Sequence, residues 1–205
     1  PMVVITGQVA TGLIGKDAFQ ECDITGITLP IIKHNYLIHD VNDLARIVKE
    51  AFFIAQTGRP GPVLIDIPKN VQLATADFDY PEALDLPGYR PVLEPDPTHV
   101  ATAAELMNKA ERPVIIAGRG VIVSQAYEEL RELAERYQAP VVHTMLGLGS
   151  FPPQHDLDLG MLGHHGTVAA NRAVQDADLV LAIGTRLGDR ATMRTKDFAR
   201  QAVLV

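Results

Sequence analysis

The sequence predicts an α/β protein built on parallel sheets, and three observations support this fold class. Short apolar runs of strand length recur at residues 63–65, 113–117 and 179–183. Between such runs, apolar residues repeat at the spacing of a helix face, as in residues 41–56 and 124–138. The connections from helix to strand are short, which is typical of the alternating units of a doubly wound sheet.

The first part of the chain contains short predicted elements joined by loops. The opening residues are apolar and partly β-branched, which favours a buried strand. In chain order we expect a strand at residues 2–6, a glycine loop at 7–12, a short helix at 16–21, a connector at 23–28 and a further strand at 31–37.

A clearer helix and strand follow. Asp40 is the expected N-cap of a helix over residues 41–56. Gly58 is expected just past its end, because glycine readily adopts the left-handed conformation that closes a helix. The strand at 63–65 comes next, and Pro68 ends it because proline cannot donate to a ladder.

Residues 72–97 show no periodicity and contain five prolines, so we expect an extended linker between two domains. Asp96 is the expected N-cap of the next helix, with Pro97 as its first residue. From there strands and helices alternate again. The expected strands are residues 113–117, 140–144 and 179–183, and a further strand begins at 203–205. The expected helices are residues 97–110, 124–138 and 166–176. Glycine turns are expected at 118–120 and 147–149.

Composition argues against several classes of protein. The formal net charge of −7 disfavours nucleic acid or an anionic membrane as the main partner. No apolar run approaches the ~20 residues of a membrane-spanning helix. Cys22 is the only cysteine, which excludes an intramolecular disulfide and favours a reducing compartment; we expect it to be buried and inert. The start lacks a signal peptide and an initiator Met, so we expect a piece of a longer protein.

Glycine-marked strand ends form the candidate binding site. Ligands of a doubly wound sheet bind at the carboxyl ends of its strands, and three such ends here carry glycine, at residues 118–120, 144–150 and 184–190. Glycine lets backbone N–H groups approach a phosphate, and Arg186 and Arg190 could pair with a diphosphate. We therefore expect a nucleotide; the alternative is that these residues only form turns. The first segment is not a full dinucleotide fingerprint, because it lacks the third glycine and the following acid.

The remaining motifs give no further candidate site. The adjacent pair His164 and His165 is not expected to bind a metal, because adjacent side chains diverge and no carboxylate or cysteine stands at ligand spacing. Neither a nucleophile elbow nor a phosphate-binding Walker loop is present.

Seven short motifs occur in order along the chain. They are residues 5–9 (ITGQV), 14–21 (IGKDAFQE), 33–36 (KHNY), 58–63 (GRPGPV), 146–150 (LGLGS), 161–167 (MLGHHGT) and 189–190 (DR). Together they resemble the large catalytic subunit of acetohydroxyacid synthase (acetolactate synthase), a thiamine-diphosphate enzyme family. The resemblance spans nearly the whole chain and is most specific in the first seventy residues.

The resemblance implies three domains, of which this chain holds parts of two. Residues 1–75 would be the C-terminal part of the pyrimidine-binding domain, 76–97 a linker, and 98–205 the FAD-binding middle domain, truncated at its end. The implied cofactors are thiamine diphosphate, Mg²⁺ and FAD. The catalytic glutamate would precede Pro1 and the Mg²⁺ motif would follow Val205, so this piece alone is expected to be inactive.

The resemblance also implies roles for individual residues. Gln20 matches an active-site glutamine near the thiamine, while Ala10, Phe19 and Lys69 match the wall of the substrate channel. Arg59 matches an arginine that contacts FAD from the first domain. The residues that fall where the family holds FAD in the middle domain are Gly118, Gly120, Thr144, Met145, Leu162, Gly163, His165, Gly184, Arg186 and Arg190. No residue of this chain is expected to bind a metal.

Four positions depart from the family pattern. Ala10 stands where proline is usual, Arg119 interrupts a three-glycine turn, His164 replaces a methionine and Gly188 an aspartate. The last three lie in the FAD region, so they leave open whether FAD is retained and which substrate is preferred.

The implied activity is the condensation of two 2-oxoacids, pyruvate with pyruvate or 2-oxobutyrate, with loss of CO₂ in branched-chain amino-acid biosynthesis. The alternatives are another thiamine-diphosphate carboligase or decarboxylase, or an inactive nucleotide-binding module if the chain ends at Val205. The implied partners are the 2-oxoacids, further copies in a homodimer or homotetramer, and a small regulatory subunit. The implied compartment is the cytoplasm, or a plastid in a plant or alga.

Overall fold

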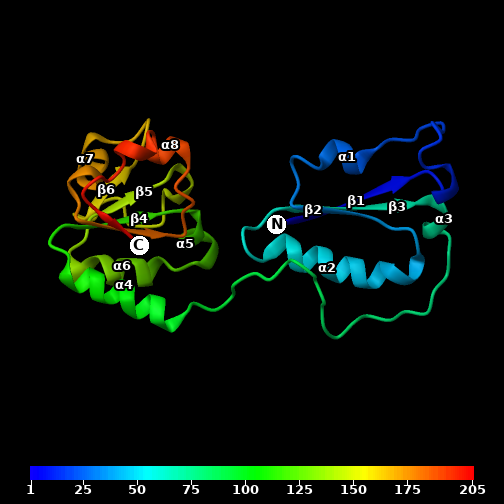
Figure 1. Cartoon of the computed structure of the whole chain (residues 1–205), viewed down its shortest axis with the longest axis horizontal. Coiled ribbons are helices and arrows are strands. Elements are labelled where there is room, and N and C mark those ends of the chain that lie inside the picture. Colours follow the sequence, from blue (N-terminus) through cyan, green and yellow to red (C-terminus); the bar gives the residue numbers. More distant parts are fainter. The chain divides into compact units, whose positions relative to one another are not determined.

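The computed structural model describes residues 1–205, which pack as two compact units, Pro1–Glu94 and Pro95–Val205 (Figure 1). All strand pairs in both units are parallel. Helices cover both sheets. This arrangement confirms the predicted α/β fold class.

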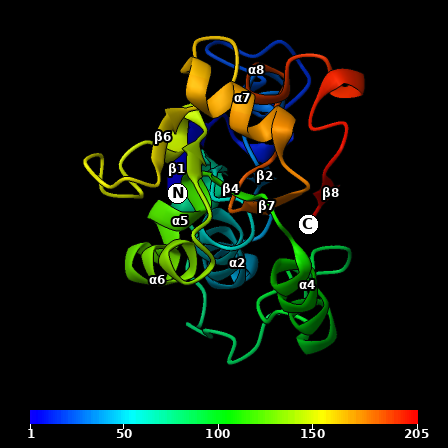
Figure 2. The same cartoon turned by 90° about the vertical axis from the view of Figure 1, so that its left-hand side faces the viewer.

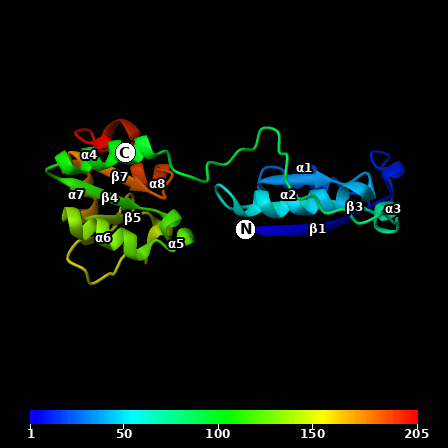
Figure 3. The same ribbon diagram turned by 90° about the horizontal axis from the view of Figure 1, so that it is seen from below.

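The first unit is a three-stranded sheet in the order β1-β3-β2. Its strands are β1 (Met2–Gln8), β3 (Pro62–Pro68) and β2 (His34–Leu37). Helix α2 (Leu44–Gln56) packs on one face, and the short helix α1 (Ile24–Thr28) lies on the other (Figures 1 and 3). The strand predicted at residues 63–65 is therefore the central strand of this sheet, and it ends at Pro68 as expected.

The core of the first unit lies between α2 and the sheet. Val63 and Ile65 alternate along β3 and are fully buried against Ala51 and Ile54 of α2. Gly58 has φ +55° just past the end of this helix, which confirms its predicted closing role. The start of the helix differs from the prediction: Asp40 caps a 3₁₀ turn, η2 (Val41–Asp43), and α2 begins at Leu44.

The short helix predicted at residues 16–21 is wrong. The Glu21 carboxylate accepts hydrogen bonds from the N–H groups of Gly15 and Ala18, and this folds the segment into a loop. Asp17 and Gln20 take left-handed conformations, with φ +56° and +63°, which a helix cannot contain. The helix forms instead at α1, in the expected connector, because the Asp23 side chain accepts from Gly26 N and caps its start.

Two further short elements belong to the first unit. A 3₁₀ turn, η1 (Thr11–Leu13), follows β1, and a single helical turn, α3 (Lys69–Gln72), follows β3. Beyond α3 the linker has no helix or strand up to Asp96, as predicted. Part of it nevertheless packs on the first unit, because Tyr89 OH receives a hydrogen bond from Lys33 Nζ (2.8 Å) and Lys49 Nζ donates to Glu82 O (2.9 Å).

The second unit is a five-stranded sheet in the order β6-β5-β4-β7-β8. Its strands are β4 (Pro113–Ala117), β5 (Val141–His143), β6 (Asp158–Met161), β7 (Leu179–Ile183) and β8 (Val203–Leu204). The chain runs outward from β4 to β6 and then returns to β7 on the other side of β4. The strand order therefore reverses between β4 and β7, which is the topological switch point of a doubly wound sheet.

Helices cover both faces of this sheet (Figures 1 and 2). One face packs against α4 (Pro97–Lys109), α5 (Arg119–Ser124) and α6 (Tyr127–Tyr137). The other packs against α7 (Val168–Asp176) and α8 (Asp189–Thr192). All five residues of β4 are buried between the two layers, as expected for a central parallel strand.

Several boundaries in the second unit differ from the prediction. The expected glycine turn at 118–120 is the start of α5, and Gln125 (φ +58°) separates this helix from α6, which begins at Tyr127 rather than at 124. Strand β6 and helix α8 were not predicted, nor were the 3₁₀ turns η3 (Met145–Gly147) and η4 (Thr195–Asp197). The N-cap Asp96 with Pro97 at the first helical position is confirmed, because the Asp96 carboxylate accepts from Thr98 N at 2.8 Å.

Candidate functional site

The switch point of the second unit is packed by glycine against glycine. A Cβ atom on Gly118 would lie 2.4 Å from Gly184 O, and one on Gly120 would lie 2.4 Å from Gly184 Cα. Gly184 itself has φ +59°. Only glycine allows the backbones that leave β4 and β7 to approach this closely.

The amides of two of these glycines are already used within the fold. Gly118 N donates to Ile183 O and Gly120 N donates to Gly184 O, each at 2.9 Å. We had expected such N–H groups to face a phosphate. These two amides are therefore not free to bind a phosphate, and the glycines instead allow the two backbones to pack against each other.

The loops after β5 and β6 join the same end of the sheet. Thr144 N donates to Ala117 O (3.0 Å), which ties the start of the β5 loop to β4, and Leu162 N donates to His143 O (2.8 Å), which ties β6 to β5. Met145 is 75% exposed beside Thr144. The strand ends that carry the predicted nucleotide residues are thus brought together at one edge.

Helix α8 closes this edge beside β6. His164 N donates to Arg190 O at 3.0 Å, and a Cβ atom on Gly163 would lie 2.1 Å from that same carbonyl. Gly163 has φ +101°, so a glycine is required there both for the contact and for the backbone conformation.

Cationic and apolar groups surround the glycines. The side chains of Arg119, Arg186 and Arg190 are exposed at this end of the sheet. Next to the switch point is a hollow of about 290 Å³. Its lining is mostly apolar and consists of Gly120, Val121, Ser124, Ala126, Glu129, Leu130, Leu133, Ile183 and Gly184. Guanidinium groups suit the phosphates of a ligand, and an apolar hollow suits a ring portion.

The histidine pair after β6 differs from the prediction in one respect. We expected adjacent side chains to diverge, but the rings of His164 and His165 meet edge to face with centroids 4.7 Å apart, because the two residues lie in a loop. Both are exposed. The chain brings no group of three or more His, Cys, Asp or Glu side chains into a metal-binding cluster.

In the first unit, two predicted channel residues lie at the same end of the sheet. Ala10 follows β1 and Lys69 follows β3, whose registered ends are Gln8 and Pro68. A hydrogen bond from Thr11 N to Asn70 Oδ1 (2.8 Å) joins the segments next to them. The carboxyl edge of this sheet therefore places Ala10 and Lys69 on adjacent segments.

Gln20 and Phe19 lie on the loop that leaves this edge, and both side chains are exposed, Phe19 by 89%. Gln8 anchors the loop: its Nε2 donates to Cys22 O (2.7 Å) and to the buried carboxylate of Asp66 (3.0 Å). Asp66 also accepts from Thr6 Oγ1 at 2.7 Å. Sequence reasoning missed this network, although polar residues inside two apolar strands were the available signal.

Arg59 lies apart from these channel residues. It is exposed in the turn between α2 and β3, at the amino end of the strand, whereas Lys69 follows the carboxyl end. Seven strand residues separate the two ends, which corresponds to ~20 Å.

Two smaller observations complete the description. Cys22 is exposed, so the expectation that it is buried was wrong. No helix has both the length and the apolar character needed to cross a lipid bilayer.

These features define an α/β protein whose second unit is a doubly wound sheet with a glycine-packed switch point. Residues 100–205 match the model of a protein family described as "Thiamine pyrophosphate enzyme, central domain". The chain belongs to this family.

Relatives with more specific names match the whole chain. It is 52% identical over 205 residues to the acetolactate synthase large subunit of Corynebacterium glutamicum and 50% identical over 205 residues to the acetolactate synthase of Mycobacterium leprae. It is 45% identical over 209 residues to the acetolactate synthase large subunit of Pyropia yezoensis. Each match covers 100% of this chain but 33–35% of the relative, so the chain spans about a third of the length of these proteins. The resemblance seen in the sequence motifs is thereby confirmed.

Proposed function

We propose that this chain is part of an acetolactate synthase, which condenses pyruvate with a second 2-oxoacid, pyruvate or 2-oxobutyrate, and releases CO₂. One observation carries the proposal: the chain is 52% identical, over its whole length, to a relative named as the large subunit of that enzyme. We further propose the domain division 1–75, 76–97 and 98–205.

The first unit would contribute to the site of reaction. Thiamine diphosphate, held with Mg²⁺ by residues outside this chain, would supply the electron sink for decarboxylation. Gln20 would border the reacting carbonyl, and Ala10, Phe19 and Lys69 would line the approach of the substrate. The Lys69 ammonium, exposed at the carboxyl end of β3, would attract the carboxylate of an incoming 2-oxoacid.

The second unit would hold FAD, and its residues fit this cofactor. Gly184 is exposed at the switch point, the hollow of about 290 Å³ could take a ring portion, and exposed arginines could neutralise the phosphates. The residues that would hold FAD are Gly118, Gly120, Thr144, Met145, Leu162, Gly163, His165, Gly184, Arg186 and Arg190, with Arg59 from the first unit.

The departures from the family pattern do not remove this fit. Arg119 and His164 are exposed, so neither side chain fills the glycine floor. Gly188 lies at the N-cap of α8, where a Cβ atom would meet the Arg186 side chain at ordinary contact distances of 3.6–3.8 Å.

The same departures favour a second candidate, another thiamine-diphosphate carboligase or decarboxylase with a different substrate. In either case we propose a homodimer or homotetramer, with a small regulatory subunit, in the cytoplasm or, in a plant or alga, the plastid.

The test uses the complete protein encoded by the gene that contains this chain, supplied with thiamine diphosphate, Mg²⁺ and FAD. We expect acetolactate to form from pyruvate, and the purified protein to show flavin absorbance. Formation of acetaldehyde without acetolactate would favour a decarboxylase and contradict the first proposal. Acetolactate formation without bound flavin would leave the reaction intact and contradict the FAD site.

A further inference from the structure

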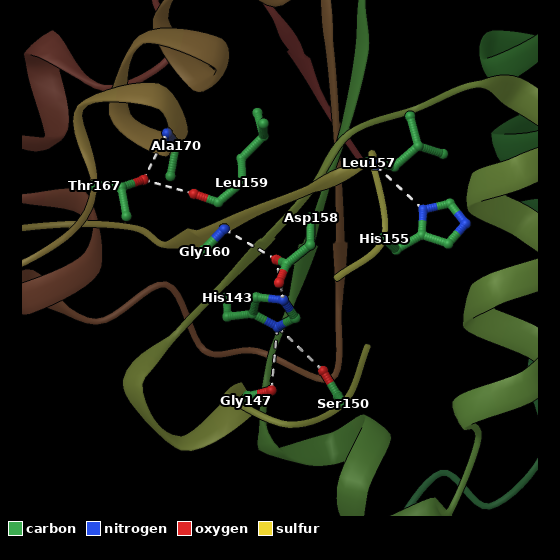
Figure 4. Close-up of polar contacts among 10 residues, drawn as sticks. All are labelled: His143, Gly147, Ser150, His155, Leu157, Asp158, Leu159, Gly160, Thr167 and Ala170. Atoms are coloured by element: carbon green, nitrogen blue, oxygen red, sulfur yellow. Dashed lines mark hydrogen bonds and ion pairs between the residues drawn. The ribbon is translucent and has the colours of Figure 1, made fainter. Parts of the chain in front are cut away.

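A buried histidine, His143, is the last residue of β5, and Figure 4 shows its polar contacts. His143 is 1% exposed. It is the last residue of its strand, so the residue that follows it is Thr144, one of the proposed FAD contacts. None of the roles proposed above uses His143.

Each ring nitrogen of His143 faces a different segment. Nε2 lies 3.0 Å from Asp158 Oδ1 at the start of β6, whereas Nδ1 lies 3.2 Å from Gly147 O and 3.3 Å from Ser150 Oγ in the loop after β5. Ser150 is also 1% exposed. The ring therefore links the loop after β5 to the start of β6.

These three side chains are not a catalytic triad. A nucleophilic serine must reach the substrate, but the Ser150 hydroxyl is enclosed with the imidazole. The array has to act through the backbone segments that it holds.

On the β6 side, the segment held is a bulge. Val141 pairs with Asp158 and His143 with Met161, so three steps along β6 oppose two along β5. Gly160 adopts φ +81° in this bulge, and its N–H donates to Asp158 Oδ1 (2.9 Å), the same oxygen that faces His143. Bulges change the direction of the strand that follows, which here leads directly to Leu162 and Gly163.

A second side chain secures the bulge from the other side. Thr167 Oγ1 donates to Leu159 O (2.6 Å) and accepts from Ala170 N (3.0 Å) at the start of α7. The bulge is thus held between the His143–Asp158 pair and the cap of α7. The chain beyond it leaves β6 in a defined direction.

We propose that His143 is a positioning residue for the nucleotide site. Through Gly147 and Ser150 it sets the loop that carries Thr144 and Met145, and through Asp158 it sets the bulge that directs Leu162 and Gly163. This inference rests on the proposed FAD site and goes beyond it, because His143 touches no predicted ligand residue with its side chain.

Two substitutions can distinguish the contacts of the two ring nitrogens. The carboxamide nitrogen of His143→Gln can reach the place of Nε2 and keep a donor toward Asp158. That of His143→Asn reaches only the place of Nδ1 and keeps a donor toward Gly147. His155→Gln is the matched control, because His155 lies on the same β5–β6 connection and contacts Leu157 N and Glu135 instead.

The experiment measures two quantities on the complete protein that contains this chain. The first is amide hydrogen exchange of Ser150 and Gly160 without ligand. The second is the affinity for FAD alone, from flavin fluorescence. We expect His143→Gln to speed exchange at Ser150 only and His143→Asn at Gly160 only, each roughly tenfold, since a buried polar group loses a partner in each variant. Both should weaken FAD binding by about tenfold, while His155→Gln changes neither quantity.

The outcomes distinguish the inference from the function on which it rests. If the wild-type complete protein binds no FAD, the proposed flavin site fails and the inference fails with it. If the wild type binds FAD and both His143 variants bind it equally well, only the inference is overturned. Unchanged exchange at both amides in the His143 variants would also overturn it.

Discussion

Asp66 and Gln8 connect a buried charge to an exposed loop. Asp66 is 1% exposed, and its two carboxylate oxygens accept from Thr6 and Gln8, so its desolvation is offset by hydrogen bonds from both neighbours. Gln8 in turn holds Cys22 O, close in sequence to Gln20. A residue inside the sheet can thus fix the position of a loop residue that is proposed to face the substrate.

A second single residue, Arg59, lies at the surface of the first unit. Its side chain is exposed, and Arg59→Ala should change the free energy of unfolding by no more than ~0.5 kcal/mol, as is usual for surface substitutions. If Arg59 neutralises a flavin phosphate, the same variant should retain several-fold less FAD after gel filtration of the complete protein. Arg90→Ala, another exposed arginine of this unit, is the control. Equal flavin content in all three proteins would show that the assignment at this position is incorrect.

The contact between β4 and β7 depends on residues without side chains. Gly120→Ala would place a Cβ atom 2.4 Å from Gly184 Cα, and a hydrogen bond from Gly120 N to Gly184 O holds the two backbones together. We expect a loss of ~1–3 kcal/mol in the free energy of unfolding, from overpacking at a site that cannot relax. Urea denaturation measures this loss. Gly12→Ala, where no atom lies within 4 Å of the added Cβ, should be close to neutral; similar stability of the two variants would contradict this account of the switch point.

A carboxylate links the turns before β4 and β7. Asp178 accepts from Glu111 N (2.7 Å) and Arg112 N (2.9 Å). Burial raises the pKa of Asp178, but these hydrogen bonds and the positive charge of Arg112 together outweigh it, so the pKa lies below its ordinary value of 3.8. Because the folded-state pKa is the lower one, its contribution to stability is present above pH ~3.8 and is lost as the pH falls through the folded-state value.

Asp178→Asn should therefore be less stable than the wild type at neutral pH, and the difference should shrink below pH ~4. Urea unfolding at a series of pH values measures it. Asp156→Asn, at an exposed aspartate of the same unit, serves as the control. A difference that stays constant down to strongly acidic pH would rule out the ionic origin of this contribution.

At the scale of the whole molecule, each unit has its own core. In the first unit, Ile65 of β3 is buried against α2. In the second unit, Ile115 of β4 is buried against α4 and α6. Both residues are 0% exposed. We expect Ile65→Ala and Ile115→Ala each to cost ~2–5 kcal/mol within their own unit. Calorimetry should then show two transitions, with each variant lowering only one midpoint. A single transition lowered equally by both variants would mean that the units unfold together.

The proline-rich linker also contacts the first unit. Up to Tyr89 it packs on the first unit, because Lys33 and Thr57 bond to the Tyr89 hydroxyl at 2.8 and 3.0 Å. The same lysine donates to the last carbonyls of α2 next to the turn that carries Arg59. The linker is therefore anchored close to that arginine.

The sequence by itself determined the elements with strong local signals. Asp96 and Pro97 at a helix start, Gly58 at a helix end and the apolar runs of β3, β4 and β7 act within a few residues, so their effect can be read without tertiary contacts. The ordered motifs likewise indicated the family that the comparisons confirm.

Only the tertiary structure decided the elements that depend on distant partners. The loop at 16–21 escapes helix formation through the Glu21 carboxylate, and β6 exists because His143, Asp158 and a glycine bulge hold a short strand beside β5. The glycines at 118, 120 and 184 were visible as turns, but their mutual contact depends on strands that are more than sixty residues apart. Local propensity cannot encode such contacts, because each partner is stabilised only once the other is in place.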